Sequence, residues 1–461
     1  MERKSLEKII NKLMNTGADF GEIYYEDTHH KRLNYIDSKL DKVVNTLERG
    51  ISFRIALNND VYFSTTNNIN QDNLDKVISL LAKNINENIK FSNIRLNRLT
   101  KFKSHAKINH NDMSDINKRK YLHKFDELIR SKDNRIAQVS LSLEEIDSNI
   151  TIVNHTGLYK KENRVRTILY VKVNFKDDNL NATSSFSYGK SAGYEIFSEI
   201  DMDKVANDLV ASGIDKLYAK ACVGMEMPVI LESGFGAVLF HEACGHAMEA
   251  TSVADNLSIL SGKLNTKIAS DKVTIIDDGT IDNLWGTTNI DDEGNDTRKN
   301  LLIKNGILVN YLIDTLNNRK MHMNITGSSR RESYKYAPTS RMNNTYLCSG
   351  NDSVADMIKS IDLGLYAKKL GGGCVSTETG DFNFNVTDAY MIRDGKIAEC
   401  VKSASLIGNT QDILNNVEMV SDNLEFDNGM CGSISGWVNV TIGEPTIKIS
   451  KILVGGEKND W

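Results

Sequence analysis

Long apolar segments are missing from this sequence of 461 residues. No run of about 18 apolar residues occurs, so the sequence offers no candidate for a membrane-spanning helix. The first twenty residues, MERKSLEKIINKLMNTGADF, are charged and amphipathic and lack the apolar core of a secretory signal. We therefore expect a cytoplasmic protein that makes no membrane contact.

An excess of basic residues is also missing. The 56 Lys and Arg are outnumbered by 61 Asp and Glu, which gives a net charge of -5. Proteins that bind nucleic acid normally carry a basic face or stripe, so we expect no direct nucleic-acid partner. Apolar residues at 40% and charged residues at 25% are close to globular averages, which argues against a disordered chain.

Regularly spaced cysteines, internal repeats and low-complexity tracts are absent as well. The six cysteines are spread through the C-terminal 240 residues, at Cys222, Cys244, Cys348, Cys374, Cys400 and Cys431. In a long chain without a secretory signal, free thiols or a metal ligand are expected rather than disulfides.

The apolar patterning predicts an α+β fold in two domains. Helical spacing predicts helices over 2–16, 73–88, 115–130 and 201–219, and strict alternation over 136–145 and 165–175 predicts half-buried antiparallel strands. After Cys222 the chain consists mainly of Gly-bounded β segments, and helices are scarce apart from HEACGH and 351–362. We predict a helix-rich α/β N-terminal domain at 1–221 and a C-terminal domain dominated by antiparallel β-sheet at 222–461.

The segment SGFGAVLFHEACGHAMEA contains the most informative group of residues. An apolar stretch, which would bury a helix, precedes His241, Glu242 and His246. Hydrolytic zinc needs neutral nitrogen ligands and a base beside its water. We interpret His241 and His246 as candidate metal ligands and Glu242 as the candidate general base. The alternative is a chance grouping on a buried helix, because a short motif has limited specificity.

The spacing of the two histidines is unusual for one helix. Residues five positions apart are rotated by roughly 500°, which leaves the imidazoles roughly 140° apart on a regular helix. One wide turn with i→i+5 hydrogen bonds brings them nearly into line, and such turns cluster at functional sites. Gly245 would lower the steric cost of this distortion, or of ending the helix there. We therefore predict a widened or broken turn at 242–246.

The third metal ligand is left open by residue types alone. A catalytic zinc typically has three protein ligands and one open position. Cys431, in the Gly-rich segment DNGMCGSISG, offers a thiolate that suits a zinc already bound by two nitrogens. Any of the other cysteines, or an acid such as Glu249, also meets the requirement.

Blocks along nearly the whole chain resemble the TldD/PmbA peptidases, also called modulators of DNA gyrase, and in particular their metal-bearing TldD type. They follow the order of that family and include ADFGEIYYED, GISFRIAL, LFHEACGHAMEA, KVTIIDDGTIDNLWGTTNIDDEGNDT, GSSRRESYKYAPTSRMNNTYL, GGGCVSTETGDFNFNVTDAYMIRDGKI and CGSISGWVNVTIGEPTIKISKILVGG. This chain-wide match is far more specific than the six-residue motif.

The resemblance implies a ligand set and an activity. It implies that His241, His246 and Cys431 hold one zinc ion and that Glu242 is the catalytic acid/base. The expected activity is zinc-dependent hydrolysis of unfolded peptides or small proteins inside the cavity of a dimer. The second subunit would be a TldE/PmbA-type paralogue, which lacks the HExxxH motif, or another copy of this chain. The alternatives are a non-catalytic peptide-binding subunit and, less well supported, a DNA gyrase modulator.

The sequence departs from the family pattern at two places. Cys244 stands where a small apolar residue is more usual, and we interpret it as a small buried hydrophobe. The segment TSVADNLSILSGK, which follows the motif, lacks the basic residues often found there.

Two polar segments are further candidates for function. GSSRRESYKYAPTSRMNNT offers donors for an oxyanion; its residue types favour a solvated loop, whereas the resemblance favours a substrate-binding loop. The donors are Arg330, Arg331, Tyr334, Tyr336 and Arg341. IDDGT and IDDEGNDT lack the spacing of a calcium loop. We therefore interpret their acids as turn residues at strand ends, namely Asp277, Asp278, Asp291 and Asp292.

Overall fold

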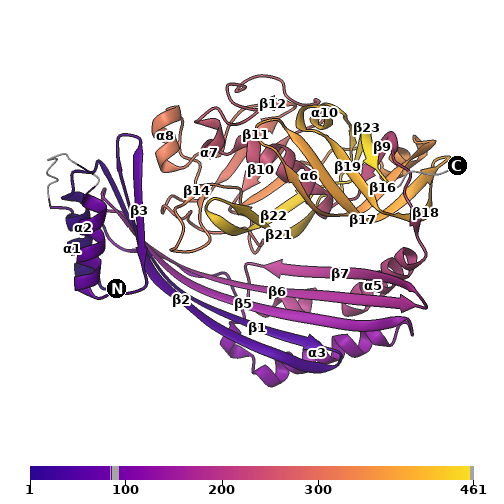
Figure 1. Cartoon of the computed structure of the whole chain (residues 1–461), viewed down its shortest axis with the longest axis horizontal. Helices are drawn as coiled ribbons and strands as arrows, with labels where there is room; N and C mark the ends of the chain where they lie inside the picture. The colour runs from indigo at the N-terminus through magenta and orange to yellow at the C-terminus, as the bar shows by residue number, and fades with distance from the viewer. Residues whose placement is uncertain (84, 86–92, 457–461) are drawn as a thin grey trace.

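The computed structural model describes residues 1–83, 85 and 93–456. Its fold is α+β, as the sequence predicts, with one large sheet in the N-terminal part and three sheets in the C-terminal part. Figure 1 shows the N-terminal sheet as a long curved layer, with α3 and α5 on its outer side and the C-terminal part on the other side.

The N-terminal sheet has seven strands in the order β3-β2-β1-β5-β6-β4, and β7 also pairs with β6. Its strands are β1 (Phe20–Ile36), β2 (Lys39–Leu57), β3 (Asp60–Thr66), β4 (Thr100–Phe102), β5 (Ile136–Asn154), β6 (Tyr159–Asp177) and β7 (Leu180–Lys190). Its helices are α1 (Arg3–Met14), α2 (Gln71–Ala82), α3 (Asp115–Arg130), α4 (Ile196–Glu199) and α5 (Met202–Leu217), with a 3-10 turn at His110–Asp112.

The predicted helices occur close to their expected positions. α3 begins where the sequence indicates, because the Ser114 side chain accepts a hydrogen bond from the backbone N–H of Asn117. α2 ends at Ala82, and the end expected at 88 lies outside the described residues. The expected domain boundary near 222 falls directly after β8 (Lys220–Ala221), which pairs with a strand of the C-terminal part, and the division there stays a prediction.

The N-terminal sheet is half-buried over much of β6, as alternation predicts, but both of its faces are covered next to the C-terminal part. One face packs on the helices, with Leu169 and Val171 against α3 and α5. On the opposite face, Arg164 and Arg166 lie between the sheet and the C-terminal part, and Arg166 is only 4% exposed. Arg164 and Arg166 therefore face another layer of protein, whereas Tyr170 and Lys172, farther along the same face of β6, are exposed to solvent.

The C-terminal part contains a six-stranded sheet in the order β12-β11-β10-β15-β22-β21 and an eight-stranded sheet in which β16 pairs with both β9 and β17. The six-stranded sheet has β10 (Ile275–Asp278), β11 (Lys299–Lys304), β12 (Ile307–Leu308), β15 (Asn344–Leu347), β21 (Glu425–Ser433) and β22 (Gly436–Glu444). The eight-stranded sheet has β8 (Lys220–Ala221), β9 (Met225–Leu231), β16 (Leu363–Val375), β17 (Asp381–Arg393), β18 (Lys396–Lys402), β19 (Ala404–Asn409), β20 (Val417–Val420) and β23 (Ile447–Gly455). β13 (Ser329–Arg330) and β14 (Thr339–Ser340) form a small hairpin.

The helices of the C-terminal part are short, as expected. They are α6 (Val238–Phe240), α7 (Ala250–Val253), α8 (Thr315–Met321), α9 (Val354–Lys359) and α10 (Thr410–Asn415). α6 lies in the largest apolar core, where Leu239, Phe240 and Met248 are buried. That core fixes the position of the HEACGH segment.

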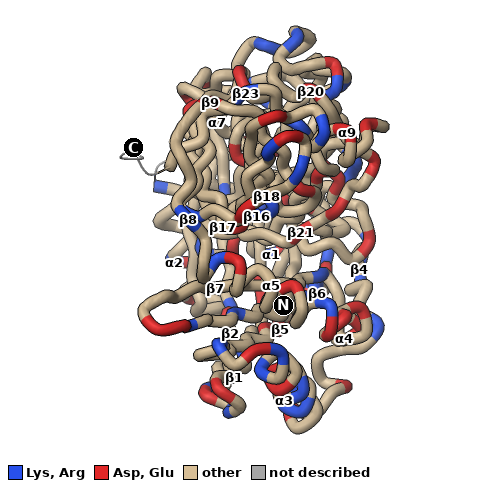
Figure 2. Tube along the Cα trace, turned by 90° about the vertical axis from the view of Figure 1, so that its right-hand side faces the viewer, with Lys and Arg blue, Asp and Glu red and all other residues tan. Residues whose placement is uncertain are grey.

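The surface carries charges of both signs. Figure 2 shows Lys and Arg interspersed with Asp and Glu along both parts of the chain. In the described parts of the chain, no helix combines the length and apolar character needed to cross a membrane.

Candidate metal centre

The predicted widened turn is confirmed. His241–Gly245 form a π-helical turn that follows α6 and leads into a 3-10 turn at His246–Met248. Gly245 has a φ of -56°, an ordinary helical value, so relief of backbone strain was the wrong reason for glycine there. A Cβ on Gly245 would lie 2.2 Å from the Sδ atom of Met342. The glycine is required by close packing against the buried Met342 side chain.

The wide turn directs both imidazoles toward one thiol. The Nε2 atoms of His241 and His246 each lie 3.1 Å from the Sγ atom of Cys431. The three donor atoms lie within 4.8 Å of one another, and no other group of three His, Cys, Asp or Glu suited to a metal ion was found among the described residues. Cys431 lies on β21, the edge strand of the six-stranded sheet.

This donor set fits zinc. Zinc binds thiolate at about 2.3 Å and imidazole nitrogen at about 2.0–2.1 Å, so a tetrahedral site separates sulfur from nitrogen by about 3.6 Å. The distances from Cys431 to the two imidazoles are within about half an ångström of that value. Three such donors leave the fourth position open, which is typical of catalytic rather than structural zinc.

The electrostatics of the centre favour the thiolate that a metal requires. Burial by itself would raise the pKa of the Cys431 thiol, but the imidazoles of His241 and His246 hold that pKa well below its usual range. Burial by itself would lower the pKa of His246, but Glu249 and Cys431 raise it well above its usual value. A metal ion would therefore replace protons already shared among these groups.

Glu249 and Arg341 connect the two sides of the centre. The Oε2 atom of Glu249 lies 3.1 Å from Nδ1 of His246, on the side of the ring away from Cys431. Its Oε1 atom lies 3.6 Å from Nε of Arg341. The Nη2 atom of Arg341 donates a hydrogen bond of 2.6 Å to the backbone carbonyl of Cys431. Glu249 thus orients a ligand rather than joining the donor set, a common arrangement around metal-binding histidines.

The side chains of Glu242 and Cys244 lie in different environments, one partly exposed and the other buried. The Oε2 atom of Glu242 lies 3.7 Å from Nε2 of His246, and the Glu242 side chain is 24% exposed, which leaves it accessible to water. The Cys244 thiol donates to the Phe240 carbonyl at 3.0 Å inside the core, and burial raises its pKa to about 12. Cys244 is therefore buried, as expected.

The arginine-rich segment after 327 is not a solvated loop, so the reading from residue types was wrong. Arg330, Arg331 and Arg341 are each at most 5% exposed. Arg331 forms an ion pair of 2.6 Å with Glu22 of β1, and Arg341 is bound to the β21–β22 turn. These two side chains hold parts of the fold together, which a count of polar residues could not reveal.

The acidic segments occur at strand ends and turns, but their side chains are buried. Asp277 accepts a hydrogen bond of 2.7 Å from the backbone N–H of Asn343, and burial raises its pKa to about 6. Asp292 forms an ion pair of 2.7 Å with Arg164. Asp292 therefore contributes to the contact between the two parts of the chain, whereas Asp277 binds within the C-terminal part.

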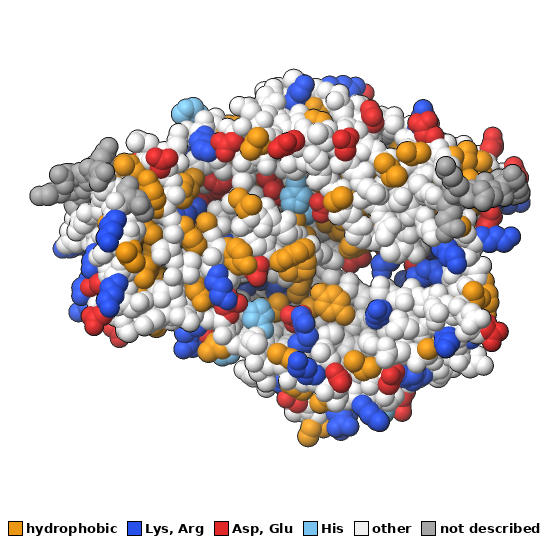
Figure 3. All heavy atoms as spheres, in the orientation of Figure 1, with side chains coloured by type: hydrophobic (Ala, Val, Ile, Leu, Met, Phe, Trp, Pro, Cys, Tyr) orange, Lys and Arg blue, Asp and Glu red, His pale blue; other side chains and the backbone are white. Residues whose placement is uncertain are grey.

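A cavity of about 280 Å³ lies between the N-terminal sheet and the β21–β22 hairpin. Figure 3 shows the surface hollowed between the two parts, with apolar side chains around the hollow. The cavity is lined by Met430, which precedes Cys431 in the chain, and by Val438, which pairs with Cys431 across the hairpin. The cavity was not predicted from the sequence, although polar residues at alternate positions of β1 and β6 are its signal.

Comparisons with known proteins agree along the chain. Three family models match, described as PmbA/TldA metallopeptidase domain 1 at residues 21–85, the central domain at 108–217 and the C-terminal domain at 224–456. A "Metalloprotease TldD homolog" of Haemophilus influenzae is 31% identical over 99% of this chain and 97% of its own length. A "Zinc metalloprotease TldD homolog" of Saccharolobus solfataricus is 27% identical over 97% of this chain and 99% of its own length.

Solved structures share the fold. A putative modulator of a DNA gyrase from Thermotoga maritima has a TM-score of 0.79 at 18% identity and covers 98% of this chain and 99% of its own. TldE from Thermococcus kodakarensis has a TM-score of 0.77 at 19% identity and covers 98% of this chain and all of its own, 100%. At these identities the likeness concerns the fold alone.

Proposed function

The chain belongs to the PmbA/TldD metallopeptidase family, and from that premise we propose that it is a zinc-dependent peptidase acting on unfolded peptides or small proteins. The observation that carries the proposal is the convergence of His241, His246 and Cys431, with the Glu242 carboxylate beside them. When bound, zinc would act as a Lewis acid that polarises a carbonyl group and lowers the pKa of a water molecule.

Each residue of the centre has a distinct role in this proposal. His241, His246 and Cys431 hold the metal, and Glu249 fixes the orientation of the His246 ring. Glu242 takes the proton of the attacking water and transfers it to the leaving amine, because its carboxylate is both adjacent to the ligands and open to solvent.

The edge strand β21 offers a way to hold a substrate without reading its sequence. β21 carries Cys431 and pairs with β22 on one side only among the described strands. An extended peptide that adds to such an edge is bound through its backbone. This arrangement favours unfolded substrates of many sequences.

The proposed assembly is a dimer, either with a TldE/PmbA-type paralogue or with a second copy of this chain. The likeness to TldE supports a family in which both kinds of subunit share one fold. This chain carries the HExxxH motif at His241–His246, which places it on the catalytic side of the proposal. Its cytoplasmic location stays a prediction.

The direct test compares wild type with Glu242→Ala for zinc content and for cleavage of casein or unstructured peptides, with and without a paralogous subunit. We expect one zinc per chain in both proteins and hydrolysis only by wild type. Glu378→Gln provides a control, because it removes the charge of an exposed carboxylate that has no role in the proposed centre. Equal hydrolysis by wild type and Glu242→Ala contradicts the proposal, and peptide binding by a zinc-free, inactive wild type supports a non-catalytic subunit instead.

A further inference from the structure

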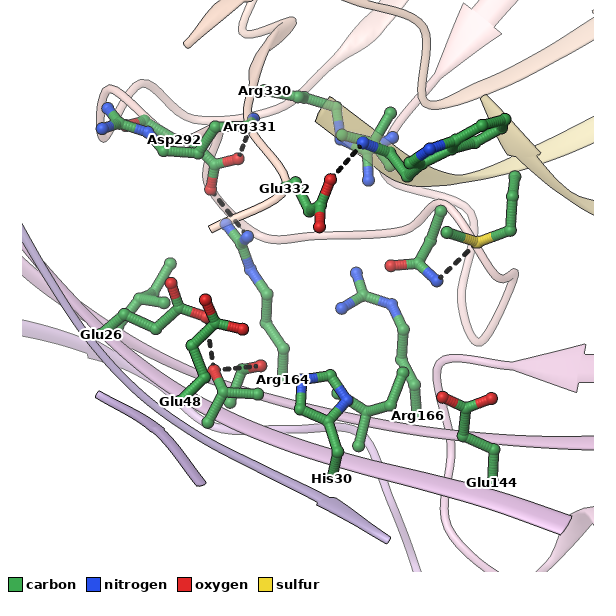
Figure 4. Close-up of a pocket in the computed structure, with 18 of the residues that line it drawn as sticks. Glu26, His30, Glu48, Glu144, Arg164, Arg166, Asp292, Arg330, Arg331 and Glu332 are labelled. Atoms are coloured by element: carbon green, nitrogen blue, oxygen red, sulfur yellow. Dashed lines mark hydrogen bonds and ion pairs between the residues drawn. The ribbon is translucent and has the colours of Figure 1, made fainter. Parts of the chain in front are cut away.

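Two buried arginines face the cavity without a carboxylate partner. Arg166 extends from β6 and donates only to backbone carbonyls, at 3.1 Å to Trp285 and 3.3 Å to Thr287. Arg330 extends from β13 on the opposite wall and donates to the Met342 carbonyl at 2.8 Å. Both are at most 5% exposed, and within the described residues no carboxylate oxygen lies within 4.0 Å of either guanidinium. Figure 4 shows both side chains at the cavity.

The neighbouring cations of the cavity are already neutralised. Arg164 forms ion pairs with Asp292 at 2.7 Å and Glu162 at 2.8 Å, and Arg32 forms one with Glu144 at 2.8 Å. These pairs leave Arg166 and Arg330 as the lining guanidinium groups that no carboxylate binds.

Two lining carboxylates also lack a cationic partner, but their oxygens are engaged elsewhere. Glu332 accepts a hydrogen bond of 2.8 Å from the backbone N–H of Trp437. Glu26 accepts from the Thr28 hydroxyl and from the backbone N–H of Tyr334, and burial raises its pKa to about 7, so it is largely protonated below that pH. Neither acid compensates the two arginines directly.

An uncompensated buried guanidinium is unfavourable, because it has lost its water without gaining a counter-ion. Burial, together with the charges of Arg164 and Arg330, lowers the pKa of Arg166 to about 9. Burial lowers the pKa of Arg330 to about 10, because the opposing effect of the Asp292 and Asp277 charges is partly offset by the charges of Arg164 and Arg341. An anion that enters the cavity would relieve this repulsion, and the planar guanidinium fork matches a carboxylate in particular.

We propose that the cavity binds the carboxylate group of a peptide through Arg166 and Arg330. This proposal rests on the proposed peptidase function and names the part of the substrate that is recognised away from the metal. Met430 and Val438 line the cavity, and Cys431 pairs with Val438 across the β21–β22 hairpin, so the cavity and the centre adjoin the same hairpin. A peptide anchored by its carboxylate would lie against the β21–β22 hairpin, which carries Cys431.

The test is equilibrium binding measured by fluorescence anisotropy, in a Glu242→Gln background that prevents cleavage during the titration. One labelled unstructured peptide is prepared with a free terminal carboxylate, with a terminal amide, and with a terminal amide after a last residue of Glu. We expect at least one carboxylate form to bind about tenfold more tightly than the plain amide, as for a charge-assisted pair. The two carboxylate forms distinguish a chain terminus from an acidic side chain.

Variants assign the preference to the two arginines. Arg166→Gln and Arg330→Gln should each abolish it, whereas Arg166→Lys, which keeps the charge but not the fork, should retain part of it. The matched control is Arg32→Gln, because Arg32 also lines the cavity but is half-exposed and paired with Glu144. Circular dichroism and thermal unfolding check the fold of each variant. If the Gln variants do not fold, the protein with both arginines intact is tested for displacement of the carboxylate peptide. Displacement by acetate but not by acetamide supports the proposal, and equal effects of the two contradict it.

Several results would overturn the proposal. These are equal binding of all three peptides, no binding of any of them, an intact preference in both Gln variants, or an equal loss in Arg32→Gln. Failure of zinc binding or hydrolysis with an intact carboxylate preference would instead contradict the proposed peptidase function and leave this site standing.

Discussion

The Sγ atom of Cys431 lies 3.1 Å from the Nε2 atom of His246, although the two residues are 185 positions apart in the sequence. His246 begins the 3-10 turn that follows the π-helical turn beside the largest core, and Cys431 lies on an edge strand whose backbone carbonyl at Cys431 accepts a hydrogen bond from Arg341. The centre therefore depends on the position of the β21–β22 hairpin as well as on the HEACGH segment. Changes that move either one should be detected as changes in metal affinity.

Glu249→Gln should weaken zinc binding without removing a ligand. Glu249 lies 3.1 Å from Nδ1 of His246, and its negative charge fixes the ring and raises its basicity. Losses on the order of 10- to 100-fold in metal affinity accompany such changes at other metal sites. Competition with a chromophoric chelator measures the affinity. An unchanged affinity would show that Glu249 has no part in the centre.

Gly245→Ala should lower the free energy of unfolding by about 1–3 kcal/mol, because the added methyl overlaps Met342 in a packed core. Met342→Ala in the same chain makes room for it, so the two changes should be non-additive in a double-mutant cycle. Chemical denaturation of the four proteins provides the free energies.

Gly372→Ala is the control for this cycle, because a Cβ there meets nothing within 4 Å. Additive effects of Gly245→Ala and Met342→Ala would mean that the packing contact does not determine the need for glycine.

Glu22→Gln should destabilise the contact between the two parts of the chain. Glu22 is 1% exposed and accepts from Arg54 at 2.7 Å and from Arg331 at 2.6 Å, so the variant removes the ion pair of Arg331 and leaves Arg54 with Glu293 alone. Breaking such a buried network costs about 3–5 kcal/mol.

Glu399→Gln breaks an exposed pair with Arg393 and should change the unfolding free energy by less than about 1 kcal/mol. Equal effects of the two variants in urea denaturation would contradict the importance assigned to the buried network.

The free energy of unfolding should depend on pH through Glu26. Burial raises its pKa from 4.5 to about 7, so between these values the folded state binds more protons than the unfolded state. Its contribution to stability is therefore present below pH 4.5 and is lost as the pH rises through 7. Glu26→Gln should gain stability relative to wild type over this range, on the order of 3 kcal/mol in total. Denaturation series from pH 4.5 to 8 measure it; a constant difference across the series would contradict the assigned pKa.

Much of the fold could be predicted from local patterns. The spacing of apolar residues predicted α3 at its observed bounds, and the alternation over 165–175 gave the face of β6 that packs on the helices. The geometry of the i, i+5 histidine pair predicted the wide turn, because a regular helix cannot direct both rings to one point.

The rest required the tertiary structure. No spacing rule relates Cys431 to His246, since it is the tertiary structure that brings the hairpin next to the turn that carries His246. The burial of Arg166, Arg330 and Arg331 was also hidden, because polar residues on the second face of a strand are the same whether water or another layer covers them. Gly245 was singled out for the wrong reason, since Met342 is distant in the sequence.

The most direct test of the proposed centre is X-ray absorption at the zinc K-edge of the purified protein. We expect one sulfur ligand at about 2.3 Å and at least two imidazole nitrogens at about 2.0–2.1 Å, and loss of the sulfur shell in Cys431→Ala. A zinc shell without sulfur, or a sulfur shell that persists in Cys431→Ala, would contradict the assignment of His241, His246 and Cys431 as the metal ligands.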